Sequence, residues 1–380
     1  MAESPAPTRL SLAGRPELRR YSRHLLIPEV GLAGQERLAA ARVLVVGAGG
    51  LGSPVLQYLA AAGVGRIGVV DDDVVDVTNL QRQTIFATTD IGQRKAAVAA
   101  ARALAINPSI AIDAIPLRFD STNARELVRL YDVIVDCTDR FSTRYLINDA
   151  CVLEGKPDVY ASIFRFDGQV TIFNYAGART GPCYRCLYPD APPPGTVPTC
   201  AEGGVLGVLA GLVGTWQANE VLKLLLRIGE PLAGRLLLVE SLGARTREVR
   251  FERDPGCAIC GEHPSIAAAV ETELDEIRDA GDVGPAELDE ALAGATLLDV
   301  REPHEAVLGL VEGAVHIPAS QLEARLHELD SARTYVVACR VGATSLWAAR
   351  RLRDAGFTRV RHLHGGLLAY AAMHESFDFF

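Results

Sequence analysis

The sequence predicts an α/β protein with a doubly wound, Rossmann-like sheet and a second, smaller α/β domain at its C-terminal end. Apolar runs such as "VLVV" (43–46) and "VIVD" (133–136) alternate with helical stretches up to residue 174, as in a parallel sheet buried on both faces. A shorter alternation resumes near residue 286, after an acidic stretch with weak β signals. We therefore predict one domain at 1–262, a linker at 263–285 and a second domain at 286–380.

The first elements form a β-α-β unit. Residues 15–41 read as helical, "VLVV" is a strand, and "GAGGLG" (47–52) leads into a helix that Gly63 ends. "RIGVVD" (66–71) is the next strand. The later elements are a helix at 94–107, a strand at 131–139, a helix at 142–155 and a strand at 168–174.

Composition excludes several classes of protein. The formal net charge of −9 gives no reason to expect nucleic-acid binding. The N-terminus has no apolar core of a signal peptide, and the apolar run 203–216 is shorter than the roughly 20 residues of a membrane span. We expect a buried helix there, no membrane association and a cytoplasmic protein, whose eight cysteines are thiols or metal ligands.

The glycine-rich loop predicts a nucleotide site. Gly47, Gly49 and Gly52 fit G-x-G-x-x-G directly after a strand, where backbone N–H groups at a helix start bind phosphate. Asp71 ends the next strand, where a carboxylate can hold ribose hydroxyls. This pattern alone is typical of NAD binding.

The residues that follow favour nucleotidyl transfer instead. Arg82 and Lys95 come soon after Asp71, and Lys95 is one of only three lysines in the chain. Asp139 ends a later strand near the switch point of the sheet. Cations neutralise a polyphosphate and a spare carboxylate holds Mg²⁺, which a dehydrogenase does not need.

Two pairs of cysteines have the spacing of a metal site. "CYRC" and "CAIC" are CxxC pairs about 70 residues apart in the chain, and four thiolates form a closed tetrahedral zinc site. A redox CxxC or unrelated thiols are the alternatives. The predicted ligands are Cys183, Cys186, Cys257 and Cys260.

Two further cysteines are candidates for chemistry. Cys200 follows the proline-rich "PDAPPPGTVPT" and precedes a helix start, which lowers a thiol pKa; an incidental loop thiol is the alternative. Cys339 ends the strand "TYVVA" and opens "CRVGATS" before a helix. Backbone N–H groups around such a thiol stabilise a thiolate or a persulfide.

Several motifs resemble one family. "RYSRHLL", "GAGGLG", "NLQRQTIF", "DCTD" and "GPCYRCLYP" are similar to the E1-like enzymes that adenylate ubiquitin-like sulfur carriers in molybdopterin and thiamine synthesis, over residues 15–262. The resemblance implies that Asp71 holds the ribose, that Arg82 and Lys95 contact the triphosphate, and that Asp139 binds Mg²⁺. It also implies a homodimer in which Arg23 reaches the partner's site. The remaining implied nucleotide contacts are Gly50, Thr78, Asn79, Leu80, Gln81 and Arg140, the last replacing the usual Asn.

The segment 286–375 resembles a rhodanese domain, on "LLDVREPHE", "GAVHIP", "CRVGATS" and "HLHGG". The usual loop reads C-x-x-G-x-R-S, and here Thr344 stands in the Arg position while Arg340 lies nearby. The resemblance implies a persulfide on Cys339, with weak activity towards thiosulfate. The resemblance of residues 15–262 to the activating enzymes implies that Cys200 attacks the acyl-adenylate or resolves a persulfide.

Together these features predict an enzyme that uses ATP, Mg²⁺ and structural Zn²⁺. It would adenylate the C-terminal carboxylate of a ubiquitin-like sulfur carrier ending in Gly-Gly and then form a thiocarboxylate. The sulfur would come from a persulfide donor of the cysteine-desulfurase type. The alternatives are an NAD-dependent oxidoreductase and a non-catalytic scaffold that docks the carrier. The pathway that uses the product is left open.

Overall fold

The computed structural model describes residues 16–175, 181–191, 204–270, 282–307, 309–371 and 373. Cys200, one of the predicted catalytic residues, lies outside this set. The chain forms two compact units. The first comprises residues up to 190 together with 205–272, and the second includes residues 273–380.

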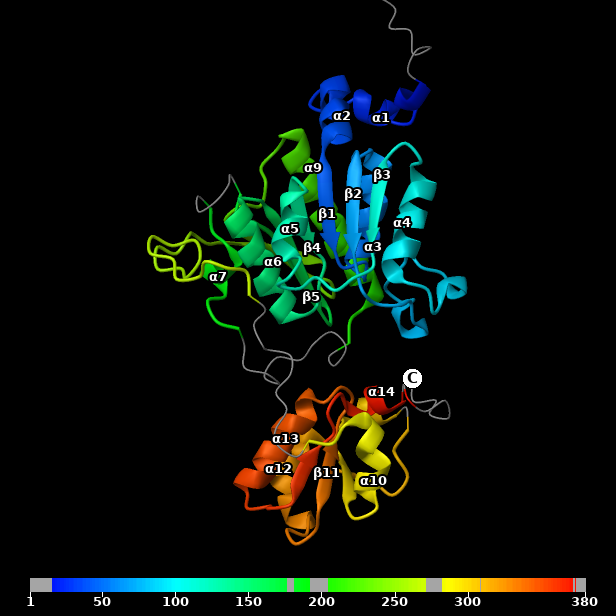
Figure 1. The fold of residues 1–380 in the computed structure, drawn as a ribbon, viewed down its shortest axis with the longest axis vertical. Helices are drawn as coiled ribbons and strands as arrows, with labels where there is room; N and C mark the ends of the chain where they lie inside the picture. Colours follow the sequence, from blue (N-terminus) through cyan, green and yellow to red (C-terminus); the bar gives the residue numbers. More distant parts are fainter. Residues whose placement is uncertain are drawn as a thin grey trace, which may run out of the picture. The chain divides into compact units, whose positions relative to one another are not determined.

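The first unit is built on an eight-stranded sheet with the strand order β3-β2-β1-β4-β5-β6-β7-β8 (Figure 1). Strands β3, β2, β1, β4 and β5 are parallel to one another. Strands β6, β7 and β8 extend the sheet in antiparallel pairing. The bounds are β1 (Arg42–Val46), β2 (Arg66–Val70), β3 (Ala111–Ile115), β4 (Val133–Asp136), β5 (Asp158–Phe164), β6 (Asp167–Phe173), β7 (Arg235–Glu240) and β8 (Arg245–Arg250).

The antiparallel extension is a correction to the predicted doubly wound sheet. The strand expected at 168–174 exists as β6, but only Arg165 and Phe166 separate it from β5. A connection this short cannot contain a crossover helix, so the two strands form a hairpin. Arg165 takes a left-handed conformation, with φ of 52°, to make the turn. The α/β class is confirmed, and the sheet is mixed.

Helices cover this sheet. The connections of the parallel half contain α3 (Gly52–Ala62), α4 (Lys95–Ile106), α5 (Ala124–Arg129) and α6 (Phe141–Glu154). Helix α3 packs against α4 and against α9 (Gly207–Leu226), while α5 packs against α6. Helices α1 (Ser22–Leu25) and α2 (Gly31–Ala40) lie at the end of the sheet where β1 begins (Figure 1).

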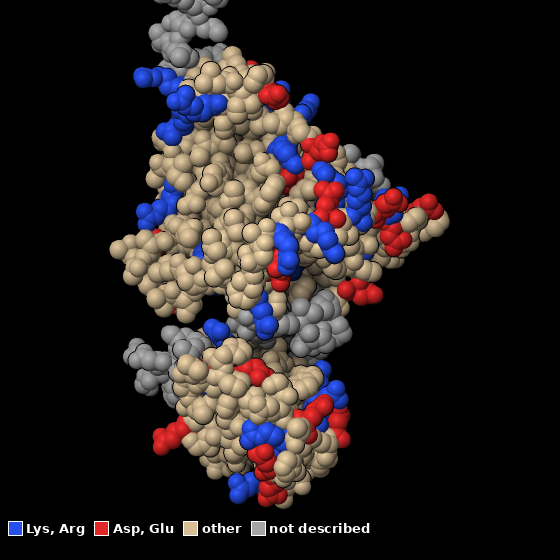
Figure 2. Space-filling model, turned by 180° about the vertical axis from the view of Figure 1, so that it is seen from behind, with Lys and Arg blue, Asp and Glu red and all other residues tan. Residues whose placement is uncertain are grey.

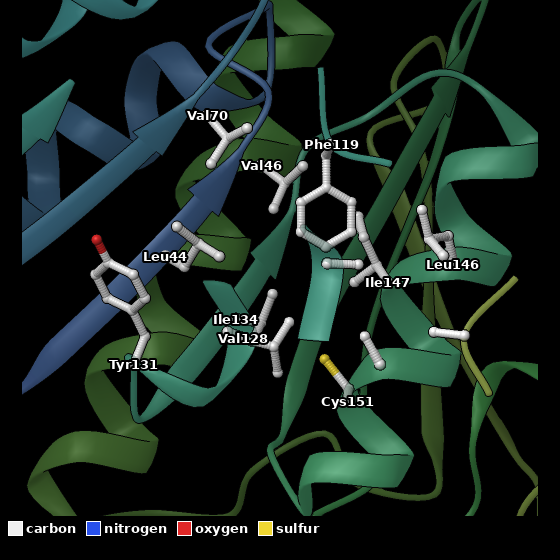
Figure 3. Packing of buried hydrophobic residues seen from close by; sticks show 13 residues of the cluster. Leu44, Val46, Val70, Phe119, Val128, Tyr131, Ile134, Leu146, Ile147 and Cys151 are labelled. Carbon is white, nitrogen blue, oxygen red and sulfur yellow. The ribbon is translucent and has the colours of Figure 1, made fainter. Parts of the chain in front are cut away.

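One core cluster holds α5 and α6 on the parallel strands (Figure 3). Leu44 and Val46 of β1 and Ile134 of β4 meet Val128 of α5 and Ile147 of α6. All are almost completely buried. Burying a side chain of this kind contributes about 1.5–3 kcal/mol. The cluster therefore fixes α6 firmly against the strand that precedes it.

The second unit contains a parallel four-stranded sheet in the order β10-β9-β11-β12. Its strands are β9 (Thr296–Asp299), β10 (Val315–His316), β11 (Tyr335–Ala338) and β12 (Val360–His362). Its helices are α10 (Leu288–Leu292), α11 (Pro303–Ala306), α12 (Leu322–Arg325), α13 (Ala343–Asp354) and α14 (Gly366–Ala371). At the end of β9, a fully buried Arg301 donates to Asp299 at 2.6 Å and to the carbonyl of Gly309 at 2.7 Å. This pair fixes the loop next to the end of β11.

The surface carries charged side chains of both signs (Figure 2), in keeping with the formal net charge of −9. On the face that Figure 2 shows, basic and acidic side chains are interspersed, and uncharged side chains cover much of the first unit's middle. Helix α9 includes part of the apolar run 203–216, as expected for a helix there. Among the described helices, none combines the length and the apolar character needed to cross a bilayer.

Candidate functional site

The glycine loop follows β1 and leads into α3. Gly47 has a φ of +97°, and a Cβ there would lie 2.8 Å from the carbonyl oxygen of Cys137. A Cβ on Gly52 would clash with the carbonyl of Gly47. Glycine is therefore required for the turn and for the close approach to the segment after β4. The loop leads into the N-terminus of α3, and a helix N-terminus can bind an anion.

Asp71 joins the glycine loop to the end of β2. One carboxylate oxygen accepts a hydrogen bond from the N–H of Ala48 at 2.8 Å, and the other accepts from the N–H of Asp73 at 2.9 Å. Burial raises the pKa of Asp71, and the charge of Lys95 opposes this shift. The carboxylate is held beside the glycine loop, as a ribose ligand requires.

Lys95 is the first residue of α4, and its side chain is only 6% exposed. Its Nζ lies 2.9 Å from Oδ2 of Asp73, whose side chain is 58% exposed. The ammonium is therefore held by a carboxylate that is itself well exposed. An incoming phosphate can therefore compete with the Asp73 carboxylate for this cation.

The segment 77–83 places Arg82 beside the glycine loop. Asp76 accepts from the N–H of Thr78 at 2.8 Å, and its own N–H donates to Oδ1 of Asn79 at 3.3 Å. Nη1 of Arg82 donates to the carbonyl of Thr78 at 3.0 Å. A Cβ on Gly50 would contact the Arg82 side chain at 3.5 Å. Asn79 thus shapes this loop, and the aliphatic part of the Arg82 side chain lies next to Gly50.

Leu80 and Gln81, two other predicted residues of this segment, follow the short helical turn. The carbonyl of Gln81 is so close to Gly207 that a Cβ on the glycine would clash with it. Leu80 directly follows the short helical turn Val77–Asn79 and is partly buried. This segment therefore connects the glycine loop with the start of α9.

Asp139 lies on the loop between β4 and α6. Strand β4 is the neighbour of β1 on the side away from β2, so this loop and the glycine loop flank the switch point where open α/β sheets bind ligands. Asp139 and Arg140 are both exposed. The structure thus brings Asp139 to the same sheet edge as Asp71, with the glycine loop between them.

Arg23 is not part of this constellation within one chain. It is exposed in α1, next to Tyr21. The Tyr21 ring lies against Gly63, and its hydroxyl accepts from Nδ2 of Asn107 at 2.8 Å. Gly63 ends α3, whereas the glycine loop begins it, and the 11 residues of this helix span about 16 Å.

The two CxxC pairs meet as one cluster. The Sγ atoms of Cys183 and Cys186 are 3.8 Å apart, those of Cys183 and Cys257 are 3.6 Å apart, and those of Cys186 and Cys260 are 3.3 Å apart. All four lie within 4.8 Å of one another. Zn–S bonds of about 2.3 Å in a tetrahedron separate the sulfurs by about 3.8 Å. The donor set and its spacing fit a structural zinc ion.

Cys339 follows β11 and is 3% exposed. The N–H of Gly342 donates to its Sγ at 3.1 Å, and Oγ of Ser345 lies 3.5 Å away. Burial raises the pKa of the thiol, while hydrogen bonds from Ser345, Gly342 and Val341 oppose that shift. The loop is a cradle of donors around one sulfur. Thr344 is partly exposed within it.

Sequence reasoning missed Arg144. This residue lies in α6, and its side chain is 6% exposed. Nη2 donates to the carbonyl of Thr138 at 3.2 Å. The only signal in the sequence is an arginine one helical turn after the start of a helix, which is usually a solvated residue.

Known relatives match both units of the chain. Residues 21–259 match the ThiF family, and residues 284–373 match the rhodanese-like domain. The sulfur carrier protein adenylyltransferase of Thermus thermophilus is 54% identical over 259 residues, covering 68% of this chain and 96% of that protein. The adenylyltransferase and sulfurtransferase MOCS3 of Bos taurus is 42% identical over 407 residues, covering 97% of this chain and 88% of that protein.

Solved structures agree for the first unit. The structure of E. coli MccB with ATP is 25% identical, with a TM-score of 0.54, and the match covers 64% of this chain and 74% of that one.

Proposed function

The chain belongs to the ThiF family and also has a rhodanese-like domain, and from this premise we propose that it adenylates a ubiquitin-like sulfur carrier and then forms the carrier's thiocarboxylate. The observation that supports this most directly is one sheet edge shared by the glycine loop, Asp71, Lys95, Arg82 and Asp139. The related Thermus thermophilus protein acts as a sulfur carrier protein adenylyltransferase. The matches favour this reaction over an NAD-dependent oxidoreductase.

In the adenylation step, ATP lies along the glycine loop. Asp71 holds the ribose hydroxyls, and the N-terminus of α3 faces the phosphates. A carboxylate oxygen of the carrier's C-terminal glycine attacks Pα, the bond to the β-phosphate breaks, and pyrophosphate leaves. Arg82 and Lys95 stabilise the negative charge that moves onto the leaving group.

Asp139 is the residue we propose to hold Mg²⁺. Its carboxylate is exposed at the same sheet edge as the phosphates, and hard oxygen donors are what Mg²⁺ prefers. A bound Mg²⁺ would neutralise charge between the phosphate oxygens. The carboxylate has to be oriented correctly for this, which makes the conformation of the loop after β4 important.

A second copy of the chain would complete the site with Arg23, because α3 separates Arg23 from its own glycine loop. The exposed apolar side chains Val208, Leu212 and Trp216 of α9 are 62%, 48% and 42% exposed at four-residue spacing. Such a stripe is typical of a protein interface. It begins beside Gln81, so a copy docked there would reach the nucleotide site. We therefore propose a homodimer.

In the sulfur-transfer step, Cys339 receives sulfur from a persulfide donor of the cysteine-desulfurase type. In one route, the terminal sulfur of the Cys339 persulfide attacks the carbonyl of the acyl-adenylate, and AMP leaves. In the other route, Cys200 first displaces AMP to form a thioester with the carrier, and the persulfide then displaces the Cys200 thiol. The resulting acyl disulfide is cleaved by Cys200 or by an external thiol, which releases the thiocarboxylate. The disulfide formed in this last step requires a thiol reductant. The role of Cys200 remains a proposal from the sequence.

Zinc, in this proposal, has a structural role on the four clustered cysteines. Their ligand set leaves no open position, so the ion supplies folding energy and no chemistry. The reduced thiols that the protein needs are consistent with a cytoplasmic location.

One experiment tests the proposed function as a whole. The protein is incubated with candidate Gly-Gly carriers, ATP, Mg²⁺ and a persulfide donor, and each carrier is weighed intact. The expected result is a mass gain equal to replacement of one oxygen by sulfur. Pyrophosphate exchange without thiocarboxylate would support adenylation alone, with the second unit acting as a docking scaffold. Absence of both would reject the proposal.

A further inference from the structure

The loop between β4 and α6 is held from both sides of Thr138. Before it, the carboxylate of Asp136 accepts from the N–H of Thr138 at 2.9 Å and from its hydroxyl at 2.7 Å. After it, Nη2 of Arg144 donates to the Thr138 carbonyl at 3.2 Å. A peptide group is planar, so the carbonyl of Thr138 and the N–H of Asp139 turn together. Arg144 therefore fixes the peptide plane that leads into Asp139.

The same guanidinium also fixes the far side of the loop. Its central carbon lies 5.1 Å from the ring centroid of Phe141, the first residue of α6, and 5.7 Å from that of Tyr160 in β5. One side chain thus bridges Thr138 and Phe141, which enclose Asp139 and its neighbour. A planar guanidinium with several donors is well suited to stack on rings and donate to a carbonyl at once.

A purely structural role does not account for this position well. Asp136 is completely buried, and burial raises its pKa while the charge of Arg144 opposes this shift, but the two side chains form no hydrogen bond with each other. Its Oδ2 has no hydrogen-bond partner among the described residues. The donor of Arg144 is directed to the loop carbonyl instead. Burial lowers the pKa of Arg144, but Tyr160, Tyr184, Asp136 and Asp139 outweigh it and raise the pKa overall.

We propose that Arg144 is a positioning residue for adenylation, which holds the peptide between Thr138 and Asp139 so that the Asp139 carboxylate stays oriented towards the metal and phosphates. The inference rests on the proposed role of Asp139. Arg144 itself is buried, and its contacts are with the loop carbonyl and two aromatic rings. Residues that orient a metal ligand typically change metal affinity by about 10–100-fold when replaced.

The test uses the full-length protein with a non-hydrolysable ATP analogue and Mn²⁺ as the probe metal, whose binding is followed by electron paramagnetic resonance. Arg144→Met removes the donor and the charge, whereas Arg144→Lys keeps the charge and one donor. We expect Arg144→Met to weaken Mn²⁺ binding about 10-fold or more, with partial recovery in Arg144→Lys. The apparent KM for Mg²⁺ in pyrophosphate exchange should rise in the same order.

Leu146→Ala is the matched control. Leu146 is fully buried in the same helix and belongs to the hydrophobic core cluster. The Leu146→Ala variant should have a lower melting temperature and an unchanged Mn²⁺ affinity. Unchanged Mn²⁺ affinity in Arg144→Met would overturn the inference and make the arginine structural. If Arg144→Met does not fold, Arg144→Lys provides the test. The inference is overturned if Arg144→Lys binds Mn²⁺ with wild-type affinity and has the wild-type KM for Mg²⁺ in pyrophosphate exchange. Unchanged Mn²⁺ affinity in Asp139→Asn would instead reject the proposed metal ligand.

Discussion

The two candidate centres are the nucleotide site around the glycine loop and the sulfur site at Cys339, and they accommodate negative charge in different ways. Around the glycine loop, charged side chains line an open sheet edge, and Lys95 pairs with a half-exposed Asp73. Around Cys339, the sulfur is buried, and its close contacts are a backbone N–H and a hydroxyl. The first arrangement suits a highly charged, exchanging substrate. The second suits a small anion that stays on the protein.

The difference follows from where each group sits in the fold. Both centres lie after the C-terminal end of a parallel strand, the common place for ligands in α/β sheets. At the first, loops from β1, β2 and β4 contribute residues from separated parts of the sequence. At the second, one loop of consecutive residues wraps one atom. The first two of the following experiments test whether the two centres act separately, and the others test what each part of the molecule depends on.

The largest expected effect comes from Cys339→Ala. If the persulfide forms only on this sulfur, the variant should lose thiocarboxylate formation completely and keep ATP–pyrophosphate exchange at the wild-type rate. Intact-mass analysis of the carrier and an exchange assay measure the two steps. The separation of centres fails if the variant still converts the carrier, because sulfur would then reach the acyl-adenylate by another route.

Asp139→Ala should have the reverse effect. Losing an electrostatic group at the place where charge develops typically costs about 100- to 1,000-fold in rate. We expect exchange to fall by that amount, while Cys339 still accepts sulfur from a persulfide donor, as seen by protein mass. Exchange at the wild-type rate in this variant would contradict the metal assignment. Asp167→Ala, at an exposed position of β6, serves as the control for loss of one surface carboxylate.

Cys186→Ser tests the zinc cluster, which belongs to the first unit. A structural zinc site contributes on the order of 10 kcal/mol to folding at neutral pH. The variant should therefore lose zinc, lose solubility and melt at lower temperature in the first unit. Metal analysis of the wild type should find one zinc per chain. Iron, or no metal, would reject the assignment. Cys151→Ser, at a buried cysteine outside the cluster, controls for replacing a core thiol.

The burial of Cys339 predicts a pH dependence. Burial raises the pKa of the thiol above its ordinary value, so little thiolate is present at neutral pH. Below that pKa the thiolate fraction rises about tenfold per pH unit. Single-turnover sulfur uptake from a small persulfide should therefore keep rising from about pH 7 to about pH 9. A plateau reached near neutral pH would show that the loop donors outweigh burial.

Much of both centres is predictable from the sequence because their parts are local motifs. The glycine loop, the CxxC pairs and the loop at Cys339 have residue types and spacings that few other structures require. The hairpin from β5 to β6 has no such signal, because an "RF" turn lacks the usual Gly or Asn. Arg144 was also missed, since only the fold shows that this helix face is buried. That Arg23 lies away from its own glycine loop depends on tertiary packing through Tyr21.

The smallest expected effect concerns Thr344, where rhodanese loops usually have arginine. Thiosulfate must be captured as a dianion, and the loop offers backbone donors but no charged one at this position. One charge-assisted hydrogen bond contributes roughly 1.5–3 kcal/mol, so Thr344→Arg should raise kcat/KM for thiosulfate by about tenfold or more. Sulfur uptake from a protein persulfide, delivered by contact, should change much less. Thr344→Gln, which adds length without charge, is the control. Equal gains in both variants would mean that the length and packing of the side chain at position 344 limit thiosulfate activity, and that the missing charge at this position does not.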